Sequence, residues 1–349
     1  MFDIKSWIRP HLLNLKPYSS ARDEYTGKEG VFLDANENSI GSVGGGEYNR
    51  YPDPYQYAIK AKLSEIKGVP TNQIFLGNGS DEAIDLLIRA FCEPKEDNII
   101  ILPPTYGMYQ VSANIHAIKV KEVLLSEDYD LRPEAILDAV DNHTKLIFVC
   151  NPNNPTANSL TINKIEKLLH DFKGVVVIDE AYIDFSSQPS FSKRLSEFSN
   201  LVVMQTFSKA WGLAALRLGI AFASVEIISV LNKIKPPYNI NLLTQKFVLE
   251  ALTHASDKDK MVAEILENRK WLAENLLQVP YIQKVYPTDA NFLLAKMPKP
   301  KEVYQKLVEN FVIVRDRSSV RLCEGCLRIT VGTKQENQIL IETMKNIKL

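Results

Sequence analysis

The stretch Val175-Val176-Val177-Ile178-Asp179-Glu180-Ala181-Tyr182 decides the fold that we expect for this chain. Its first four residues form a short apolar run that does not alternate between polar and apolar positions. Such a run is typical of a strand that is buried on both faces of a mainly parallel sheet. The acidic residue that ends it is expensive to bury unless a cationic or protonated group meets it. The stretch therefore predicts a central strand with a functional group at its carboxyl end.

Similar short apolar runs lie on both sides of this strand, between about residues 70 and 225. The other expected strands are Ile74–Leu76, Asn98–Leu102, Ala117–Leu124, Leu146–Cys150, Leu201–Gln205 and Arg217–Ala221. Helical patterns lie over Asp81–Phe91, Tyr106–Asn114, Pro133–Ala139 and Ile162–Phe172. Strands that alternate with helices predict an α/β fold around a mainly parallel sheet.

The pattern of expected elements changes at about residue 240. A long helical pattern runs from Thr244 to about Leu277. It is followed by expected strands at 291–296, 311–315 and 326–331 and by a closing helix at 335–348. The first 40 or so residues are irregular and rich in Tyr and Pro, so we expect them to pack on the C-terminal part. These patterns predict a large α/β domain over residues 45–245 and a smaller α+β domain built from residues 1–44 and 246–349.

The composition argues against several classes of protein. The chain has 349 residues with 41 Lys and Arg against 42 Asp and Glu, a formal net charge of −1, whereas nucleic-acid binders usually carry a basic excess. No apolar run approaches the roughly 18 residues that a membrane-spanning helix needs. The N-terminus lacks the charged and then apolar pattern of a signal peptide. We therefore expect a soluble cytoplasmic protein.

The cysteines and histidines do not form a convincing metal site. Cys323 and Cys326 have the spacing of a ligand pair, but no second pair of cysteines or histidines accompanies them. A structural zinc ion needs four ligands, and the five histidines are scattered. We expect no metal, and an ordinary turn at Cys323–Cys326 is favoured over a redox or metal site.

In open α/β sheets, ligands bind outside the carboxyl ends of the strands, so the residues that follow each strand are the candidates. Gly77-Asn78-Gly79-Ser80-Asp81-Glu82 follows the first expected strand and opens a helix. Backbone N–H groups at a helix start suit a phosphate, although an ordinary capped helix has the same pattern. A nicotinamide dinucleotide is the alternative ligand, but its G-x-G-x-x-G motif needs a glycine where Glu82 stands. A small phosphorylated cofactor fits better.

The other strand ends carry groups of different chemistry. They are Tyr106, Asn154 in an Asn- and Pro-rich turn, Asp179, Lys209 between hydroxyl and aromatic residues, and Arg217 at the start of a strand. Each has an ordinary explanation as a turn or surface residue. Together they match the needs of pyridoxal phosphate (PLP), which uses a lysine for its aldehyde, an acid for its ring nitrogen and donors for its phosphate.

In these residues the sequence resembles the aspartate-aminotransferase-like superfamily of PLP enzymes, and within it the histidinol-phosphate aminotransferases. The resemblance covers nearly the whole chain. The superfamily motifs are Asn151–Thr156, Asp179–Tyr182, Ser208-Lys209 with Arg217, and Leu327–Gly332. The narrower family is indicated by Leu15–Arg22, Leu33–Asn38, Arg50–Asp53 and Pro103–Tyr109. Ala157 and Ala215 depart from the pattern, because they stand where the family has glycine, but no chemical group is lost.

The resemblance implies a role for each candidate residue and makes residues 45–245 the PLP-binding domain. Lys209 resembles the lysine that bonds PLP covalently, and Asp179 resembles the acid that pairs with the ring nitrogen. The other implied cofactor contacts are Gly79, Ser80 and Asp81 at the helix start, Tyr106 over the ring, Asn154 and Tyr182 at the ring oxygen, and Thr206, Ser208 and Arg217 at the phosphate. As a general base, Lys209 needs a lowered pKa, which burial and the nearby Arg217 would provide.

The resemblance also implies partners and substrates. Tyr51 resembles a residue that reaches the phosphate from a second subunit, which implies a homodimer with shared active sites. The implied reaction interconverts histidinol phosphate plus 2-oxoglutarate with imidazole-acetol phosphate plus glutamate, in histidine biosynthesis. Arg328 and Arg315 would bind the carboxylate or phosphate and Tyr18 would cover the entrance, although a surface charge is the alternative for Arg315. Other functions left open are an aromatic-amino-acid transaminase, a phosphothreonine decarboxylase, and a binding or regulatory protein without turnover.

Overall fold

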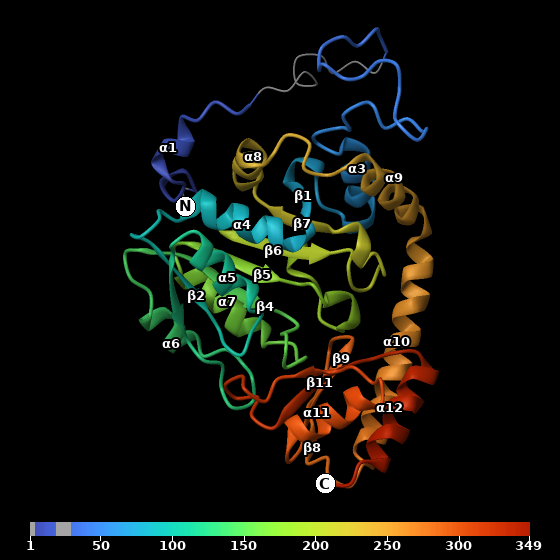
Figure 1. Ribbon diagram of the computed structural model, residues 1–349. Coiled ribbons are helices and arrows are strands. Elements are labelled where there is room, and N and C mark those ends of the chain that lie inside the picture. The colour runs from blue at the N-terminus through green and yellow to red at the C-terminus, as the bar shows by residue number, and fades with distance from the viewer. Residues whose placement is uncertain (1–3, 19–28) are drawn as a thin grey trace.

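A seven-stranded sheet forms the centre of the larger part of the molecule (Figure 1). The computed structural model describes residues 4–18 and 29–349. In spatial order the strands are β1 (Ile74–Asn78), β7 (Leu218–Ala223), β6 (Leu201–Thr206), β5 (Val175–Asp179), β4 (Thr144–Cys150), β2 (Asn98–Ile101) and β3 (Lys119–Glu122). β7 is antiparallel to both of its neighbours, and the pairs from β6 to β3 are parallel. The expected α/β fold with a mainly parallel sheet is confirmed.

The central strand β5 sends its side chains alternately into two apolar cores. Val176 and Ile178 lie in the core on one face of the sheet, and Val175 and Val177 lie in the core on the other. Helices α4 (Gly79–Phe91), α5 (Met108–Ile115) and α8 (Val225–Ile234) cover one face, and α3 (Tyr57–Lys67), α6 (Pro133–Asp138) and α7 (Ile162–Asp171) cover the other. The run is apolar throughout because both faces are covered.

A second sheet of four antiparallel strands lies below the first one in Figure 1. Its spatial order is β10 (Arg315–Asp316), β11 (Cys326–Thr330), β9 (Phe292–Lys296) and β8 (Lys284–Val285). Helices α10 (Ala255–Leu276), α11 (Pro300–Glu309) and α12 (Lys334–Asn346) share an apolar core with one face of this sheet. Leu294 and Cys326, on the other face, belong to the core of the large sheet, so the two sheets are joined by apolar packing.

Two expected elements differ most from the structure. The helix expected from Thr244 to Leu277 is divided into α9 (Leu242–Ala251) and α10 by a 3-10 turn that ends at His254. His254, with φ −108° and ψ 32°, leaves the α-helical conformation, so one continuous helix does not form. The strand expected at 311–315 is reduced to β10, because Phe311 takes a left-handed conformation (φ 59°) directly after α11. Within the described ranges, no helix is long and apolar enough to span a bilayer.

The described N-terminal residues pack on the helices of the large sheet. Ile4, Ile8 and Leu12 lie in the same core as α4 and α8, and α1 (Pro10–Leu13) lies beside α4 in Figure 1. The expected packing of this segment on the C-terminal part is therefore wrong for these residues, because nothing in so short an apolar pattern specifies which surface it covers. The domain boundaries at residues 45 and 245 stay a prediction.

Candidate active site

The carboxyl ends of the parallel strands and the start of β7 meet at one edge of the large sheet. Because β7 is antiparallel to β6, its first residues lie beside the last residues of β6, where Thr206 pairs with Gly219. Arg217, which immediately precedes β7, therefore lies at the same edge as Asp179. A pocket lies there, at the edge where open α/β sheets bind their ligands. It is lined by the sequence-predicted residues Gly79, Ser80, Asp81, Tyr106, Asn154, Asp179, Tyr182, Thr206, Ser208, Lys209 and Arg217.

One end of the pocket carries hydrogen-bond donors that suit an anion. α4 begins at Gly79 directly after β1, and its N-cap residue Asn78 makes no side-chain capping bond to the first backbone N–H groups. Arg217 Nη1 lies 3.4 Å from Ser208 Oγ, and Thr206 Oγ1 lies 3.1 Å from the same oxygen. An uncapped helix start beside a guanidinium and two hydroxyls is a suitable site for phosphate.

The approach of α4 to β7 depends on a glycine. A Cβ atom on Gly219 would lie 2.2 Å from the carbonyl carbon of Gly79 and from the backbone nitrogen of Ser80. Any larger residue would therefore push the start of α4 away from β7. This close approach at Gly219 places the start of α4 and the Arg217 guanidinium together at the phosphate end of the pocket.

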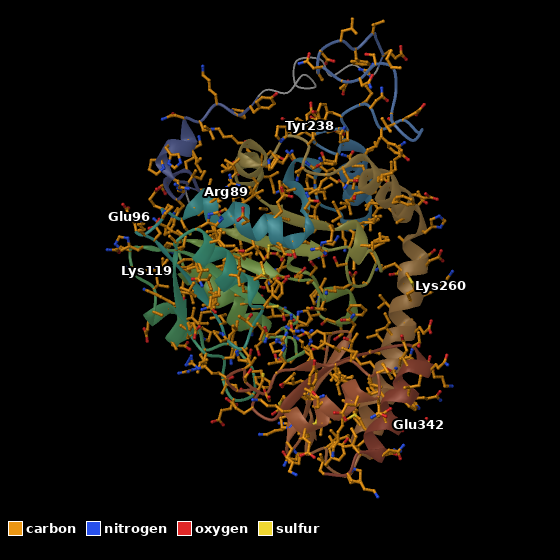
Figure 2. All side chains as sticks on the ribbon, in the orientation of Figure 1. Arg89, Glu96, Lys119, Tyr238, Lys260 and Glu342 are labelled. Carbon is orange, nitrogen blue, oxygen red and sulfur yellow. The ribbon has the colours of Figure 1, made fainter. Side chains whose placement is uncertain are left out.

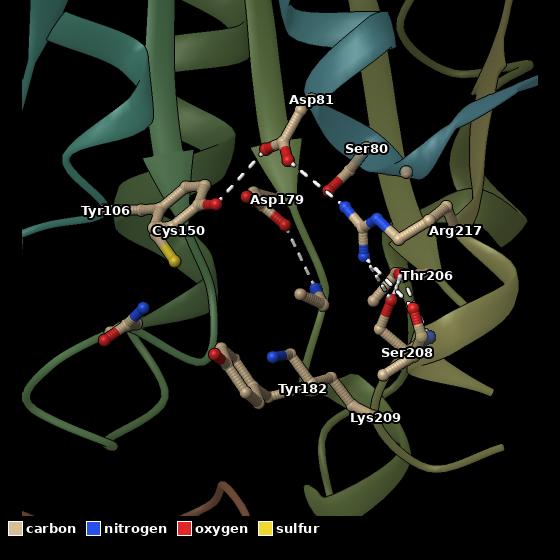
Figure 3. A pocket seen from close by; sticks show the side chains of 14 residues that line it. Ser80, Asp81, Tyr106, Cys150, Asp179, Tyr182, Thr206, Ser208, Lys209 and Arg217 are labelled. Carbon is tan, nitrogen blue, oxygen red and sulfur yellow. Dashed lines mark hydrogen bonds and ion pairs between the residues drawn. The ribbon is translucent and has the colours of Figure 1, made fainter. Parts of the chain in front are cut away.

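Asp81 lies between Tyr106 and Arg217 (Figure 3). Tyr106 donates a hydrogen bond to Asp81 Oδ1 at 3.2 Å, and Arg217 Nη2 lies 3.5 Å from Asp81 Oδ2. Burial, and then the negative charge of Asp81, raise the pKa of Tyr106, which therefore stays a neutral donor. A phosphate bound at the start of α4 would compete with Asp81 for Arg217, because both are anions. Asp81 thus orients two residues of the pocket.

Asp179 ends β5 at the back of the pocket and is 3% exposed. Its Oδ2 accepts a hydrogen bond from the Tyr109 hydroxyl at 2.6 Å, and its Oδ1 accepts one from the Ala181 N–H at 3.1 Å. Burial raises the pKa of this carboxyl, whereas the Tyr109 hydrogen bond lowers it. A cationic N–H group in the pocket would further favour the charged form.

Tyr109 is a functional candidate that the sequence did not single out. It is completely buried on α5 and stacks on Phe148, with ring centroids 4.7 Å apart. Its ring also meets that of Tyr106 edge to face, with centroids 5.6 Å apart. The expected helix over Tyr106–Asn114 was the available signal, because side chains three apart on a helix are neighbours, although Tyr106 in fact lies just before α5.

Replacing Tyr109 with phenylalanine is expected to lower kcat about 10-fold, because a hydrogen bond to a charged group contributes roughly 1.5–3 kcal/mol. The ring packing is kept, so the fold should be unaffected. Because this bond lowers the pKa of Asp179, its loss raises that pKa and the acid limb of the pH–rate profile moves to higher pH. Measuring the pH–rate profiles of the variant and of the wild type side by side checks this shift. An acid limb that does not move would show that Tyr109 acts only in packing.

Lys209 projects from the turn after β6 toward the centre of the pocket (Figure 3). Its Nζ lies 5.5 Å from the centre of the Tyr182 ring. Burial lowers the pKa of Lys209, the positive charges of Arg328 and Arg217 lower it further, and Asp179 opposes them. Arg328, in the other sheet, has a larger influence than the Arg217 named from the sequence. A lowered pKa favours the neutral amine, which is the form that attacks an aldehyde or takes up a proton.

Arg328 connects the small sheet to this pocket. It lies on β11, and its Nη1 donates a hydrogen bond to Asn154 Oδ1 at 2.5 Å. Its guanidinium carbon also lies 5.2 Å from the centre of the Phe292 ring. Asn154 lines the pocket from the turn that follows β4, so the bond crosses from one sheet to the other. A cation from the small sheet is thus held beside the pocket.

Besides Arg328, which lies next to the pocket, three of the predicted site residues lie outside it in the described chain. Tyr51 stacks on Tyr238 with ring centroids 4.4 Å apart, and Figure 2 shows Tyr238 in the upper part of the molecule. Tyr18 is 74% exposed. Arg315 is exposed on β10, directly opposite Arg328. The approach of Tyr51 from a second subunit, the lid role of Tyr18 and the binding role of Arg315 stay predictions.

Comparison of the sequence with known proteins places this chain in a family. A family model for aminotransferases of class I and II matches residues 24–344. The chain belongs to the class I and II aminotransferases. A histidinol-phosphate aminotransferase from Cytophaga hutchinsonii is 57% identical over 344 residues, which cover 99% of each chain. This aminotransferase therefore belongs to the histidinol-phosphate aminotransferase family.

Solved structures share the fold of this aminotransferase. The histidinol-phosphate aminotransferase from Sinorhizobium meliloti, in complex with pyridoxal-5'-phosphate, matches with a TM-score of 0.79 at 19% identity, covering 96% of this chain and 95% of that one. L-threonine-O-3-phosphate decarboxylase from Porphyromonas gingivalis matches with a TM-score of 0.73 at 22% identity, covering 85% of this chain and 90% of that one. The fold alone does not separate a transaminase from a decarboxylase.

The two alanines that depart from the family pattern leave the site of this aminotransferase intact. Ala157 is buried with φ 72°, and a left-handed backbone costs a residue with a Cβ atom about 1–2 kcal/mol. Its methyl group packs in a cluster with Tyr182 and Phe185, which offsets about 0.8 kcal/mol of that cost. Ala215 is exposed in a 3-10 turn and does not have a positive φ. Neither side chain displaces a group that lines the pocket.

Proposed function

We propose that this aminotransferase uses PLP to interconvert L-histidinol phosphate plus 2-oxoglutarate with imidazole-acetol phosphate plus L-glutamate, as a step of histidine biosynthesis. The observation that carries the proposal is the single pocket that joins the Lys209 amine, the buried Asp179 carboxylate and the uncapped start of α4. This donor set fits an aldehyde, a ring N–H and a phosphate respectively. PLP, when bound, supplies an electron sink for the charge that remains when the substrate loses its Cα proton.

Lys209 and Asp179 would perform the chemistry. Lys209 would hold the cofactor's aldehyde, and its neutral amine would then take up the Cα proton of the substrate and return it. Asp179 would keep the ring nitrogen protonated, since each unit by which a carboxylate raises that pKa contributes about 1.4 kcal/mol. Asn154 and Tyr182 would donate to the ring oxygen, and Tyr106 would stack on the ring. Burial raises the pKa of Tyr182, so its hydroxyl stays a donor.

Arginines from the small sheet would bind the anionic group of each substrate. The two substrates carry different anions, a carboxylate on glutamate and a phosphate ester on histidinol phosphate. A guanidinium fork forms paired hydrogen bonds with either of them. Arg328 would supply the first fork and Arg315, opposite it in the sheet, would supply the second. Tyr18 would cover the entrance.

We also infer a homodimer with shared active sites. Between residues 29 and 52, the segment that contains Tyr51 exposes several large apolar side chains: Val31, Leu33, Ile40, Val43 and Tyr48. A monomer rarely exposes so many neighbouring apolar groups. A second subunit that covers this segment would bury them and would bring Tyr51 to the phosphate end of the partner's pocket. We also propose that this dimer is located in the cytoplasm.

Purified protein loaded with PLP is expected to lose its visible absorbance band when histidinol phosphate is added and to regain it with 2-oxoglutarate. The band reports the cofactor directly, so both half-reactions can be followed in one cuvette. Bleaching by phenylalanine but not by histidinol phosphate would identify an aromatic-amino-acid transaminase. Release of carbon dioxide from O-phosphothreonine would identify a decarboxylase. Either of these results would overturn the proposed reaction.

A further inference from the structure

One face of the small sheet carries three arginines. Arg315 on β10 pairs directly with Arg328 on β11, so their side chains leave the same face. Arg317 follows two residues later, and its backbone N–H donates to the Cys326 carbonyl, which continues the ladder by one more pair. Side chains two residues apart on a strand share a face. Arg317 therefore belongs to the same face as Arg315 and Arg328.

This face of the small sheet is directed toward the large sheet. Leu294, which pairs with Arg328 from β9, and Cys326 are both buried in the core that contains the strands of the large sheet. The alternate residue Leu327 lies in the core of the small sheet, on the opposite face. Arg328 confirms the direction, because it reaches Asn154 in the pocket. The three cations therefore stand on the side from which a substrate would meet the cofactor.

Arg317 retains hydrogen-bonding capacity in this position. Its Nε is buried and has no hydrogen-bond partner within the described ranges. Asp316 points to the opposite face with Leu327, so it does not neutralise the cluster. Burial, and then the charges of Arg328 and Arg315, lower the pKa of Arg317, whereas the Cys323 thiol and then the Tyr182 hydroxyl raise it. A buried donor without a partner is costly, and an anion beside these groups would satisfy it.

We propose that Arg317 binds the phosphate ester of the substrate and makes the site favour a phosphate over a carboxylate. The inference rests on the proposed function and names a residue that tells its two substrates apart. A phosphate monoester carries a charge of about −1.5 to −2 at pH 7 and three acceptor oxygens, whereas a carboxylate carries one charge and two oxygens. The forks of Arg315 and Arg328 suffice for a carboxylate. The third guanidinium is used only when phosphate is bound.

The test compares three amino donors in single-turnover reactions of the PLP-loaded protein: histidinol phosphate, histidinol without phosphate, and L-glutamate. Arg317→Gln is expected to raise the half-saturating concentration of histidinol phosphate about 10- to 100-fold, as expected when a charged hydrogen bond is lost. The values for histidinol and glutamate should change less than about 3-fold. Arg317→Lys keeps the charge but loses the paired donors. Its half-saturating concentration for histidinol phosphate should lie between those of wild type and Arg317→Gln, and its values for the other donors should stay unchanged.

Arg321→Gln is the matched control, because Arg321 lies in the same segment and pairs with Glu122 at 2.9 Å on the surface. It should leave all three donors unchanged. An equal loss with all three donors in Arg317→Gln would show a purely structural role, and no loss with histidinol phosphate would also overturn the inference. If wild type itself fails to react with histidinol phosphate, the proposed function fails; if wild type reacts and the variant keeps its preference, only the role of Arg317 fails.

Discussion

Replacing Lys209 with alanine is expected to slow transamination by about 10⁴-fold or more, because the change removes both a nucleophile and a general base. Figure 3 shows the amine directed into the pocket beside Tyr182, and burial together with Arg328 lowers its pKa. No other lysine lines the pocket within the described ranges. Single-turnover bleaching of the visible band by histidinol phosphate measures the loss. In the wild-type protein, borohydride trapping followed by mass spectrometry should locate the cofactor on the peptide that contains Lys209.

The Lys209→Ala variant should remain folded. A buried cation with a lowered pKa opposes stability, so its removal is expected to leave the melting temperature unchanged or to raise it. Lys260→Ala is a suitable control, because Lys260 is exposed on α10 and pairs only with Asp257 in the described ranges. A rate within about 10-fold of wild type in Lys209→Ala would remove this residue from the chemistry.

Asp179→Asn is expected to lower kcat by about 10³-fold. A neighbouring charge shifts a pKa by up to about three units, and each unit contributes about 1.4 kcal/mol. Asparagine has nearly the same shape and can keep the Tyr109 contact, but it cannot hold a proton on the ring nitrogen. The same spectroscopic assay measures the rate. The cofactor should still bind through Lys209 and the phosphate site, so the loss should be in kcat.

Glu180→Gln provides the matched control for Asp179→Asn. Glu180 is the next residue along the chain and is equally buried, but it points away from the pocket to Ser190 and Gln205. Burial raises its pKa to about 7, so it is already partly neutral at physiological pH. We expect its variant to lose stability and to keep kcat within about 3-fold. Equal losses of kcat in the two variants would contradict a specific role of Asp179.

The asparagine turn shows how far the sequence specifies the site. The motif Asn151–Thr156 contains three asparagines, and the family resemblance, not the spacing of the residues, singled out Asn154. Asn151 Oδ1 accepts the Leu160 N–H at 2.8 Å, and Asn153 Nδ2 donates to the Pro104 carbonyl at 2.8 Å. Both therefore hold the turn itself. Asn154 alone of the three lines the pocket, and this choice depends on how the turn lies against α5 and the small sheet.

The N-terminal segment shows a different limit. Its apolar residues are few, and the same pattern could cover either part of the molecule. Ile4, Ile8 and Leu12 complete the core beneath α4 and α8, which no local preference of the segment could predict. The long helix after residue 240 was predicted as one element for a related reason, because the 3-10 break at Leu252–His254 contains no proline or glycine that would mark it.

The amino-acid sequence by itself determined the α/β class and the chemistry of the strand ends, because apolar runs and the residues that follow them depend on neighbours a few positions away. Only the tertiary structure decided which of these groups meet. Arg217 enters the site because β7 runs antiparallel, Tyr109 because α5 presses it against Asp179, and Arg328 and Arg317 because the small sheet turns one face toward the large one. These contacts join residues far apart along the chain. Their geometry depends on sheet pairing and core packing, which no local pattern encodes.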